Sequence, residues 1–242
     1  MQAAAGLATT GAAMRRFPAE FADLLNVRGR RFSGPPADPF FADPGLIDPA
    51  KAKAAFALLE RALGPVVKPM ARAIPPESIT GQTRNYQERL PKTVRVSTAD
   101  IDAARTKAAA VAGEIGLTAM LRSESYIAFA AKLAGHALDP AFGRQVLRYG
   151  PGDYAGPHTD HHPEEPRAKD GYFDLHLTFA GGGAARQLLV YAKDGHLTQT
   201  VDIAVAGGIT AYRLPFWHYT TPLEGKGPKA ARWVVLGTFL YA

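Results

Sequence analysis

Two side chains that could bind a metal ion stand two positions apart in the second half of the chain, at His158 and Asp160. On an extended strand, side chains at this spacing project from the same face. A neutral imidazole and a carboxylate could then bind one cation together. Because the chain has 7 histidines, such a pair is weak evidence by itself, and a third ligand is needed to support it.

The best candidate for the third ligand is His218, in a short extended run that opens with Pro215. Two histidines and one carboxylate on one face of a metal leave the opposite positions open, an arrangement typical of non-heme Fe(II) oxygenases. His196 is the rival, but it follows the predicted turn at Asp194, where a histidine is usually exposed. A core histidine packed among aromatic residues is the alternative for His218.

An arginine follows His218 after 14 positions, at the start of the apolar segment from Trp233 to Tyr241. If this residue, Arg232, points inward, it needs a carboxylate partner, because a buried unpaired charge is very costly. The partner could be an internal Asp or Glu, which would make Arg232 structural. It could instead be one carboxylate of a bound dicarboxylate, which arginine can hold through two parallel hydrogen bonds.

The order and spacing of these four residues resemble the Fe(II)- and 2-oxoglutarate-dependent oxygenases, most closely the compact bacterial prolyl-hydroxylase-like branch. The run from Arg148 to Tyr154 is similar to the family's Tyr, Gly and aromatic run before its metal-binding pair. The resemblance covers about residues 145–242. It implies a double-stranded β-helix (jelly-roll, cupin-like) core, with two facing sheets of about four strands each and iron near the open end.

The resemblance also implies roles for the residues. Fe(II) would be held by His158, Asp160 and His218, and the 5-carboxylate of 2-oxoglutarate by Arg232. With O2, the expected reaction hydroxylates an unactivated C–H bond of a small molecule, amino acid or peptide residue, and releases succinate and CO2. Asp160 favours hydroxylation, since halogenating relatives have a small residue there, but desaturation and ring formation remain open.

Further contacts are predicted less directly. Val234 stands where the family often has a serine that contacts the distal carboxylate, so another residue must replace it. The candidates for this contact are Tyr149, His176 and Thr178, and the candidates for substrate contacts are Tyr154, His162, Arg167 and Trp217. His162 and Arg167 belong to a charged insertion, which we interpret as a loop over the site or a solvated surface loop. His162 and Glu164 form a rival ligand pair.

The elements that must position these residues are predicted to be strands in the second half of the chain. Between 172 and 179, apolar residues alternate with polar ones, so one face of this strand is apolar and the other polar. The polar face would either contact bulk water or line the interior of a barrel covered by helices. Strands are predicted at 145–150, 154–160, 172–180, 186–192, 197–205, 208–214, 216–222 and 231–241.

The first half of the chain is predicted to be helical with intervening loops. One helix begins after Asp48 as its N-cap, and two others cover 97–116 and 123–135. Residues 26–45 and 65–92 are rich in Pro, Gly and charge, so we expect loops that edge the site. The fold class is therefore mainly β with N-terminal helices (α+β).

The length of 242 residues suits a single domain. We expect a flexible leader over 1–13, supporting helices and loops over 14–144, and the β-helix core with the metal site over 145–242. Neither a membrane span nor a signal peptide is indicated, which favours a cytoplasmic protein. The sequence does not predict the oligomeric state.

Composition limits the chemistry. The chain has no cysteine, which excludes disulfides, thiolate nucleophiles and Cys-based metal sites. Its net charge of +6 comes from scattered Lys and Arg, so no nucleic-acid partner is expected. Two other functions stay open: a cupin-like metal-dependent isomerase or epimerase, and a non-catalytic ligand-binding barrel. Dependence on O2 and 2-oxoglutarate would separate the first from an oxygenase, and tight metal retention would count against the second.

Overall fold

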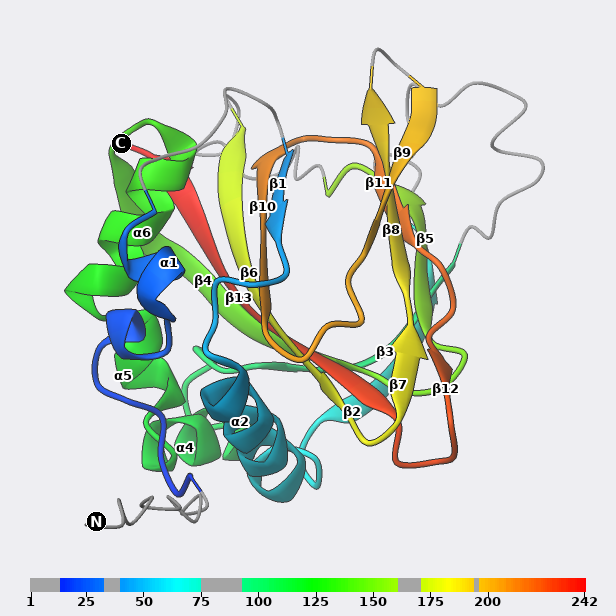
Figure 1. Cartoon of the computed structure of the whole chain (residues 1–242), viewed down its shortest axis with the longest axis horizontal. Helices are drawn as coiled ribbons and strands as arrows, with labels where there is room; N and C mark the ends of the chain where they lie inside the picture. The colour runs from blue at the N-terminus through cyan, green and yellow to red at the C-terminus, as the bar shows by residue number, and fades with distance from the viewer. Residues whose placement is uncertain (1–13, 33–39, 75–92, 161–170, 194–195) are drawn as a thin grey trace, which may run out of the picture.

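The structure is a computed structural model that describes residues 14–32, 40–74, 93–160, 171–193 and 196–242. Within these residues, one large antiparallel sheet curls into a nearly closed barrel, and helices cover one of its outer sides (Figure 1). The strand order is β1-β10-β6-β13-β4-β3-β5-β11-β8-β9, and β2 pairs with β3 at the side. No helix in this part of the chain is long and apolar enough to cross a membrane.

The strands are β1 (Phe40–Asp43), β2 (Lys68–Ala73), β3 (Thr93–Asp100), β4 (Leu138–Tyr149), β5 (Tyr154–His158), β6 (Tyr172–Gly181), β7 (Ala184–Arg186), β8 (Leu188–Lys193), β9 (His196–Asp202), β10 (Gly208–Leu214), β11 (His218–Thr220), β12 (Glu224–Gly225) and β13 (Ala231–Tyr241). The helices are the 3-10 helix η1 (Phe21–Asp23) and α1 (Val27–Arg30), α2 (Pro49–Ala62), α4 (Lys107–Glu114), α5 (Leu117–Leu121) and α6 (Glu124–Ala134). Strands β7 and β12 form a separate small sheet.

The predicted double-stranded β-helix is confirmed, and all eight strands expected after residue 145 are present. Strands β10, β6, β13 and β4 form one side of the barrel, and β5, β11, β8 and β9 form the facing side (Figure 1). Neighbouring strands within each side pair in antiparallel directions. This arrangement encloses an interior between the two sides.

Of the two places predicted for the polar face of β6, the structure shows the barrel interior. Phe173 and Leu177 lie in the main core with the helices, on the outer face of the sheet. Asp174 and His176, which alternate with them, line the interior cavity instead. Burial of each large apolar side chain stabilises the fold by about 1.5–3 kcal/mol, so the helices hold β6 with its polar face inward.

The helix expected over 97–116 is wrong in its first half. Residues Thr93–Asp100 form β3, which pairs with β4 on one edge and with β5 on the other, and so links the two sides of the barrel. β-branched residues such as Val96 favour this strand. The helix α4 begins only at Lys107, where Thr106 Oγ1 accepts a hydrogen bond from the N–H of Ala109 at 3.1 Å.

The segments 26–45 and 65–92 were expected to be loops, and their described parts contain α1, β1 and β2. Short strands of this kind gain their stability from a neighbouring strand rather than from a pattern of their own. The expectation that they edge the site is met by Met70 and Arg72 of β2 and by Ile74, which line the cavity.

The other two predicted helices are confirmed together with their caps. Asp48 Oδ1 accepts hydrogen bonds from the N–H groups of Ala50 and Lys51, both at 3.0 Å, at the start of α2. Ser123 caps α6, which ends at Gly135 in a left-handed conformation with a φ of 70°.

One carboxylate joins helix α2 to the start of β13. Glu60 accepts two hydrogen bonds from the guanidinium of Arg148, at 2.7 and 3.2 Å, and one from the indole N–H of Trp233 at 2.6 Å. Trp233 is fully buried among the helices. Because neighbouring residues of a strand face opposite sides, fixing Trp233 outward directs Arg232 into the barrel.

Candidate metal centre

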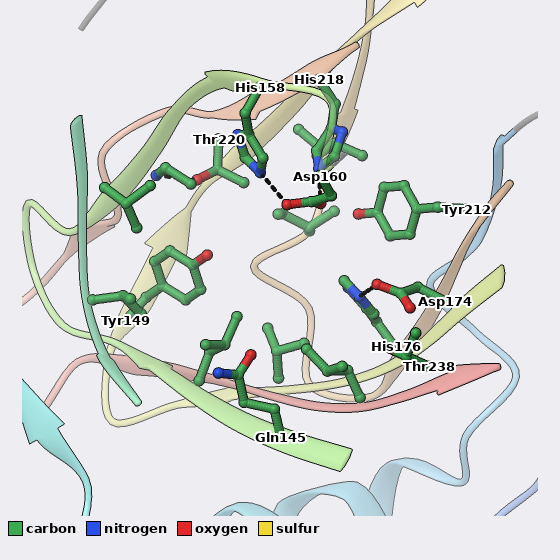
Figure 2. A pocket seen from close by; sticks show the side chains of 18 of the residues that line it. Gln145, Tyr149, His158, Asp160, Asp174, His176, Tyr212, His218, Thr220 and Thr238 are labelled. Carbon is green, nitrogen blue, oxygen red and sulfur yellow. Dashed lines mark hydrogen bonds and ion pairs between the residues drawn. The ribbon is translucent and has the colours of Figure 1, made fainter. Parts of the chain in front are cut away.

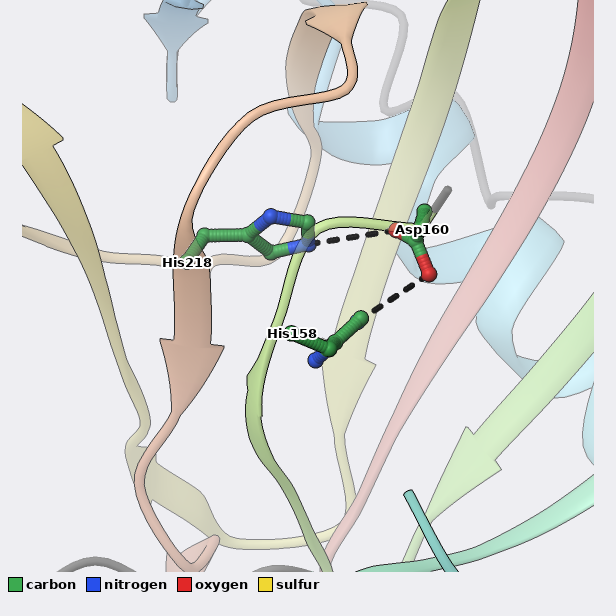
Figure 3. Close-up of side chains that lie close together, drawn as sticks. All are labelled: His158, Asp160 and His218. Carbon is green, nitrogen blue, oxygen red and sulfur yellow. Dashed lines mark ion pairs between the residues drawn. The ribbon is translucent and has the colours of Figure 1, made fainter. Parts of the chain in front are cut away.

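The three predicted metal ligands come together at the interior edge of β5 and β11 (Figure 3). Asp160 Oδ1 lies 3.2 Å from Nε2 of His158, and Asp160 Oδ2 lies 3.4 Å from Nε2 of His218. All three donor atoms lie within 4.8 Å of one another. Adjacent ligands of a metal with bonds near 2.1 Å are about 3 Å apart, so the spacing fits one ion.

Both histidines are oriented by the backbone. His158 Nδ1 lies 2.5 Å from the carbonyl oxygen of Gly156, and His218 Nδ1 lies 2.7 Å from that of Phe216. A protonated Nδ1 donates to each carbonyl and leaves Nε2 with its lone pair directed at the centre. This outer hydrogen bond is the usual partner of a metal-binding histidine.

The charges of the three groups are coupled. Burial acts to raise the pKa of Asp160, but the charge of His158 and hydrogen bonds from both histidines hold it well below its usual range. Burial and the neighbouring His158 lower the pKa of His218. For His158, burial opposes the charged form, yet the charge and hydrogen bond of Asp160 raise the pKa above its ordinary value. Asp160 is therefore anionic near neutral pH, as a metal ligand must be.

The route of the chain to Asp160 differs from the extended strand that the spacing suggested. Strand β5 ends at His158, and Asp160 has a left-handed backbone with a φ of 53°. Such a conformation is uncommon outside glycine, although Asp tolerates it better than most residues. The hydroxyl of Tyr172 donates a hydrogen bond to the carbonyl oxygen of Asp160 and supports this turn. The turn, rather than the strand, brings the carboxylate to the two histidines.

The triad opens onto a cavity of about 460 Å³ inside the barrel, lined from β2, β3, β4, β5, β6, β8, β10, β11 and β13 (Figure 2). Pockets of roughly 300–1,000 Å³ are typical of small-molecule sites. Tyr149 and Tyr212 lie on different sides of this cavity, with the triad on a third side (Figure 2). The space is sufficient for two small ligands beside a metal ion.

Arg232 lines the same cavity and is 4% exposed. Its guanidinium carbon lies 4.4 Å from the ring centre of Tyr149, its direct neighbour on β4. Among the described residues, no carboxylate forms an ion pair with it. Burial lowers the pKa of Arg232, which reflects the cost of a cation in this place. Of the two partners predicted for Arg232, no Asp or Glu of the described residues lies within ion-pair distance, although the charge of Asp202 acts on the guanidinium from farther away.

Sequence reasoning missed Gln187, which is fully buried beside Arg232. Its side-chain oxygen accepts a hydrogen bond from Arg232 Nε at 2.6 Å. Its amide nitrogen donates to the carbonyl oxygens of Thr221 at 2.9 Å and Asp153 at 3.2 Å. A single glutamine between two short strands has no pattern that indicates such a role, so no signal in the sequence could have found it.

The three candidates for the second carboxylate contact have different places. Tyr149 lies against Arg232. His176 lines the cavity but pairs with Leu236, four positions along β13 from Arg232, which is roughly 13 Å at the usual rise of a strand. Thr178 is buried beside the barrel interior, and its hydroxyl has no hydrogen-bond partner among the described residues. Only Tyr149 is in contact with Arg232.

The candidate substrate contacts are not brought to the cavity by the described residues. Ala155 and His218 face inward, so their neighbours Tyr154 and Trp217 face outward. Tyr154 instead shares a hydrogen bond with Thr93 at 2.6 Å. His162, Glu164 and Arg167 lie outside the residues that the structure describes. The rival ligand His196 is exposed on β9.

The chain is similar to known proteins in structure, but no match was found from its sequence. No family model matches the chain, and no curated protein matches it. Its structure is similar to that of the non-heme alpha-ketoglutarate-dependent epimerase SnoN from nogalamycin biosynthesis, with a TM-score of 0.53 and 18% identity over 85% of this chain and 78% of that one. Alpha-ketoglutarate is another name for 2-oxoglutarate.

A prolyl-4-hydroxylase from Pseudomonas putida also matches, with a TM-score of 0.45 and 13% identity over 85% of this chain and 94% of that one. At 18% identity, the likeness to SnoN concerns the overall fold alone. The chain therefore has a double-stranded β-helix fold that is similar to the fold of SnoN.

Proposed function

We propose that this protein is an Fe(II)- and 2-oxoglutarate-dependent oxygenase that hydroxylates a C–H bond of a small molecule, amino acid or peptide residue. The observation that carries the proposal is the pairing of two features in one cavity. One is a metal-binding set formed by His158, Asp160 and His218, and the other is a buried cation without an ionic partner among the described residues, Arg232.

The donor set fits Fe(II). Two imidazole nitrogens and one carboxylate on one side of a metal leave the remaining positions free for a co-substrate and O2. The negative charge of Asp160 attracts a cation, and the backbone contacts of both histidines direct their Nε2 lone pairs toward it. The chain has no cysteine, so no thiolate competes for the ion.

The dicarboxylate fits Arg232. Its Nε is already bonded to Gln187, and its guanidinium lies beside the ring of Tyr149. The terminal nitrogens are thus left to bind a carboxylate, which relieves the cost of the buried charge. We assign the second contact to the phenol of Tyr149, whose ring lies beside the guanidinium, in place of the serine that Val234 replaces.

When bound, the metal would allow O2 to oxidise both 2-oxoglutarate, to succinate and CO2, and the substrate C–H bond, with one oxygen atom entering each product. The residues of this chain hold the reactants and exclude bulk water. The buried walls of the barrel would hold the substrate with its C–H bond close to the metal, and such positioning is the main contribution of a protein to cofactor chemistry. Asp160 occupies the third protein ligand position and so favours hydroxylation over halogenation.

Epimerisation is a second candidate reaction, because SnoN is named as an epimerase that depends on the same co-substrate. It would use the same metal set and Arg232, and it would leave the elemental composition of the substrate unchanged. Mass spectrometry of the product separates the two reactions: hydroxylation adds one oxygen atom from O2, and epimerisation adds none.

The function is tested by succinate formation. Wild-type protein with Fe(II), 2-oxoglutarate and O2 should form succinate slowly even without its substrate, and omission of iron or of O2 should stop it. The variant His218→Ala should form none. Succinate formation that is equal in wild type and His218→Ala would contradict the proposal, since free iron in solution would then explain the reaction.

A further inference from the structure

The interior wall formed by β6 and β13 carries polar side chains for which the metal and the dicarboxylate have no use. Asp174 and His176 come from β6, and Thr238 comes from β13, where it pairs directly with Asp174. All three line the cavity. In Figure 2, the carboxylate of Asp174 and the ring of His176 point from the wall toward the middle of the cavity.

Asp174 is a buried carboxylate with an incomplete set of partners. Its side chain is 10% exposed, and its Oδ1 has no hydrogen-bond partner among the described residues. Its Oδ2 lies 3.6 Å from Nε2 of His176, which is longer than a hydrogen bond, and this Nε2 also has no partner there. A buried anion in this condition is costly unless a cation or a donor reaches it.

No cation of the described chain meets this need. The arginines that line the cavity are Arg72 and Arg232, and neither forms an ion pair with Asp174 within the described residues. Arg232 stands six positions before Thr238 on β13, so about 20 Å of strand separates it from this wall. The other cavity carboxylate, Asp160, already has two histidines. Asp174 is thus the carboxylate of the described cavity lining that has no role in binding the metal or the dicarboxylate.

The wall lies close to the metal centre. The ring centre of Tyr212 is 5.0 Å from that of His218 and 4.7 Å from that of His176, so one aromatic ring separates the metal ligand from His176. Tyr212 is also the direct neighbour of Asp174 on β10. A group bound at Asp174 would therefore leave a carbon only a few bonds away within reach of the metal.

We propose that Asp174, together with His176 and Thr238, is a subsite for a protonated amine of the substrate. The reaction of a bound amine depends on the proposed function, whereas the binding of the amine at this subsite does not. An ammonium group offers three N–H donors. The carboxylate of Asp174 accepts a charge-assisted hydrogen bond, and the hydroxyl of Thr238 or the free nitrogen of His176 accepts another. The ring of Tyr212 beside this position suits a cation as well.

The substrate class is therefore a small primary amine, or an amino-bearing compound, whose oxidised carbon lies a few bonds from the nitrogen. This narrows the range of small molecules, amino acids and peptide residues that the metal centre alone leaves open. In a peptide, the side chain of lysine meets the requirement, whereas proline does not offer a primary amine.

Binding is tested with matched pairs of probes: n-butylamine against 1-butanol, and cadaverine against 1,5-pentanediol. Each is titrated calorimetrically into the full chain, once with Fe(II) and 2-oxoglutarate under nitrogen and once with neither. At least one amine should bind wild type tenfold or more tightly than its alcohol. Asp174→Asn should lose this preference, and the control Asp102→Asn should keep it. If no amine exceeds its alcohol, or if Asp174→Asn keeps the preference, the subsite does not bind a cation.

A second measurement does not need a ligand. Asp102 is a structural carboxylate that pairs with Arg144 at 3.0 Å and Arg122 at 3.1 Å, so Asp102→Asn should lower the melting temperature. Asp174→Asn removes a buried charge whose recorded ion-pair partner, the imidazole of His176, lies 3.6 Å away and beyond hydrogen-bond distance, so the melting temperature should stay the same or rise. If Asp174→Asn lowers the melting temperature as much as Asp102→Asn does, Asp174 is a structural residue and the inference is wrong.

The two arms separate this inference from the proposed function. If wild-type protein forms no succinate, the oxygenase function is contradicted. A preference for the amine over its alcohol, measured without added metal, would still support the subsite. Succinate formation without any amine preference would sustain the oxygenase and reject the subsite.

Discussion

The side-chain oxygen of Gln187 accepts a hydrogen bond from Nε of Arg232 at 2.6 Å. The amide nitrogen of the same residue donates to two backbone carbonyls, of Asp153 and Thr221. These two bonds fix which end of the amide faces Arg232. Gln187 thereby holds one edge of the guanidinium without neutralising its charge, and the other edge is left for an anionic ligand.

The first prediction concerns Gln187. Gln187→Leu removes the partner of Arg232 Nε, so the guanidinium loses its fixed orientation, and we expect affinity for 2-oxoglutarate to fall by roughly tenfold, the effect of one hydrogen bond to a charged group. Affinity for Fe(II) should not change, because Gln187 does not touch the metal ligands. Both affinities are measured by anaerobic titration.

A merely structural role for Gln187 would give another result, because loosening of the barrel would weaken Fe(II) and 2-oxoglutarate together. Gln199→Leu, on β9 outside the cavity, is the matched control. It should leave both affinities as they are in wild type.

The second prediction concerns Arg232 itself. Arg232→Lys keeps one positive charge but loses the planar pair of donors, so the 5-carboxylate gains at best one contact. Loss of one charge-assisted hydrogen bond of about 1.5–3 kcal/mol raises the apparent Michaelis constant for 2-oxoglutarate roughly ten- to a hundredfold. Succinate formation is titrated against 2-oxoglutarate. An unshifted titration, with a lowered melting temperature, would make Arg232 a structural residue.

The third prediction separates ligands from bystanders. Asp160→Ala and His218→Ala should weaken Fe(II) binding by more than the roughly 10- to 100-fold that loss of an outer-shell partner brings. His136→Ala and His196→Ala remove exposed imidazoles and should change nothing. Equilibrium dialysis with iron analysis gives the affinities. Tight iron binding in His218→Ala would show that a different residue is the third ligand.

The fourth prediction concerns stability. Glu60→Ala removes the acceptor of Arg148 and of the buried indole of Trp233. We expect the free energy of unfolding to fall by about 1–3 kcal/mol, because a buried donor is left without a partner. Denaturant unfolding measures it. The control Glu114→Ala, exposed on α4, should change it little; equal losses would mean that Glu60 does not anchor α2.

Much of the site could be predicted because its residues carry chemistry in their types and spacing. His158, Asp160 and His218 were proposed as ligands in this way, and the alternation in β6 predicted a polar face without showing whether it met water or the barrel interior. The strands after residue 145 were found because alternation and turn residues are local signals.

What could not be predicted depends on partners far away in the sequence. The second half of β3, from Ser97, was expected to be helical from its local pattern, but its pairing with β4 outweighs that pattern. The left-handed turn at Asp160 and the contact of Gln187 with Arg232 arise only when the barrel closes. The missing partner of Asp174 has the same origin, since a sequence does not show which charges remain unpaired.

The central claim is that the metal set and Arg232 together bind Fe(II) and 2-oxoglutarate in one cavity. The most direct test is the visible spectrum of metal-free protein after anaerobic addition of both. We predict a weak metal-to-ligand charge-transfer band that appears only when both Fe(II) and 2-oxoglutarate are added. The band should be absent in His218→Ala, and in Arg232→Lys it should require a higher concentration of 2-oxoglutarate. No band in folded wild-type protein at saturating concentrations of both would contradict the central claim.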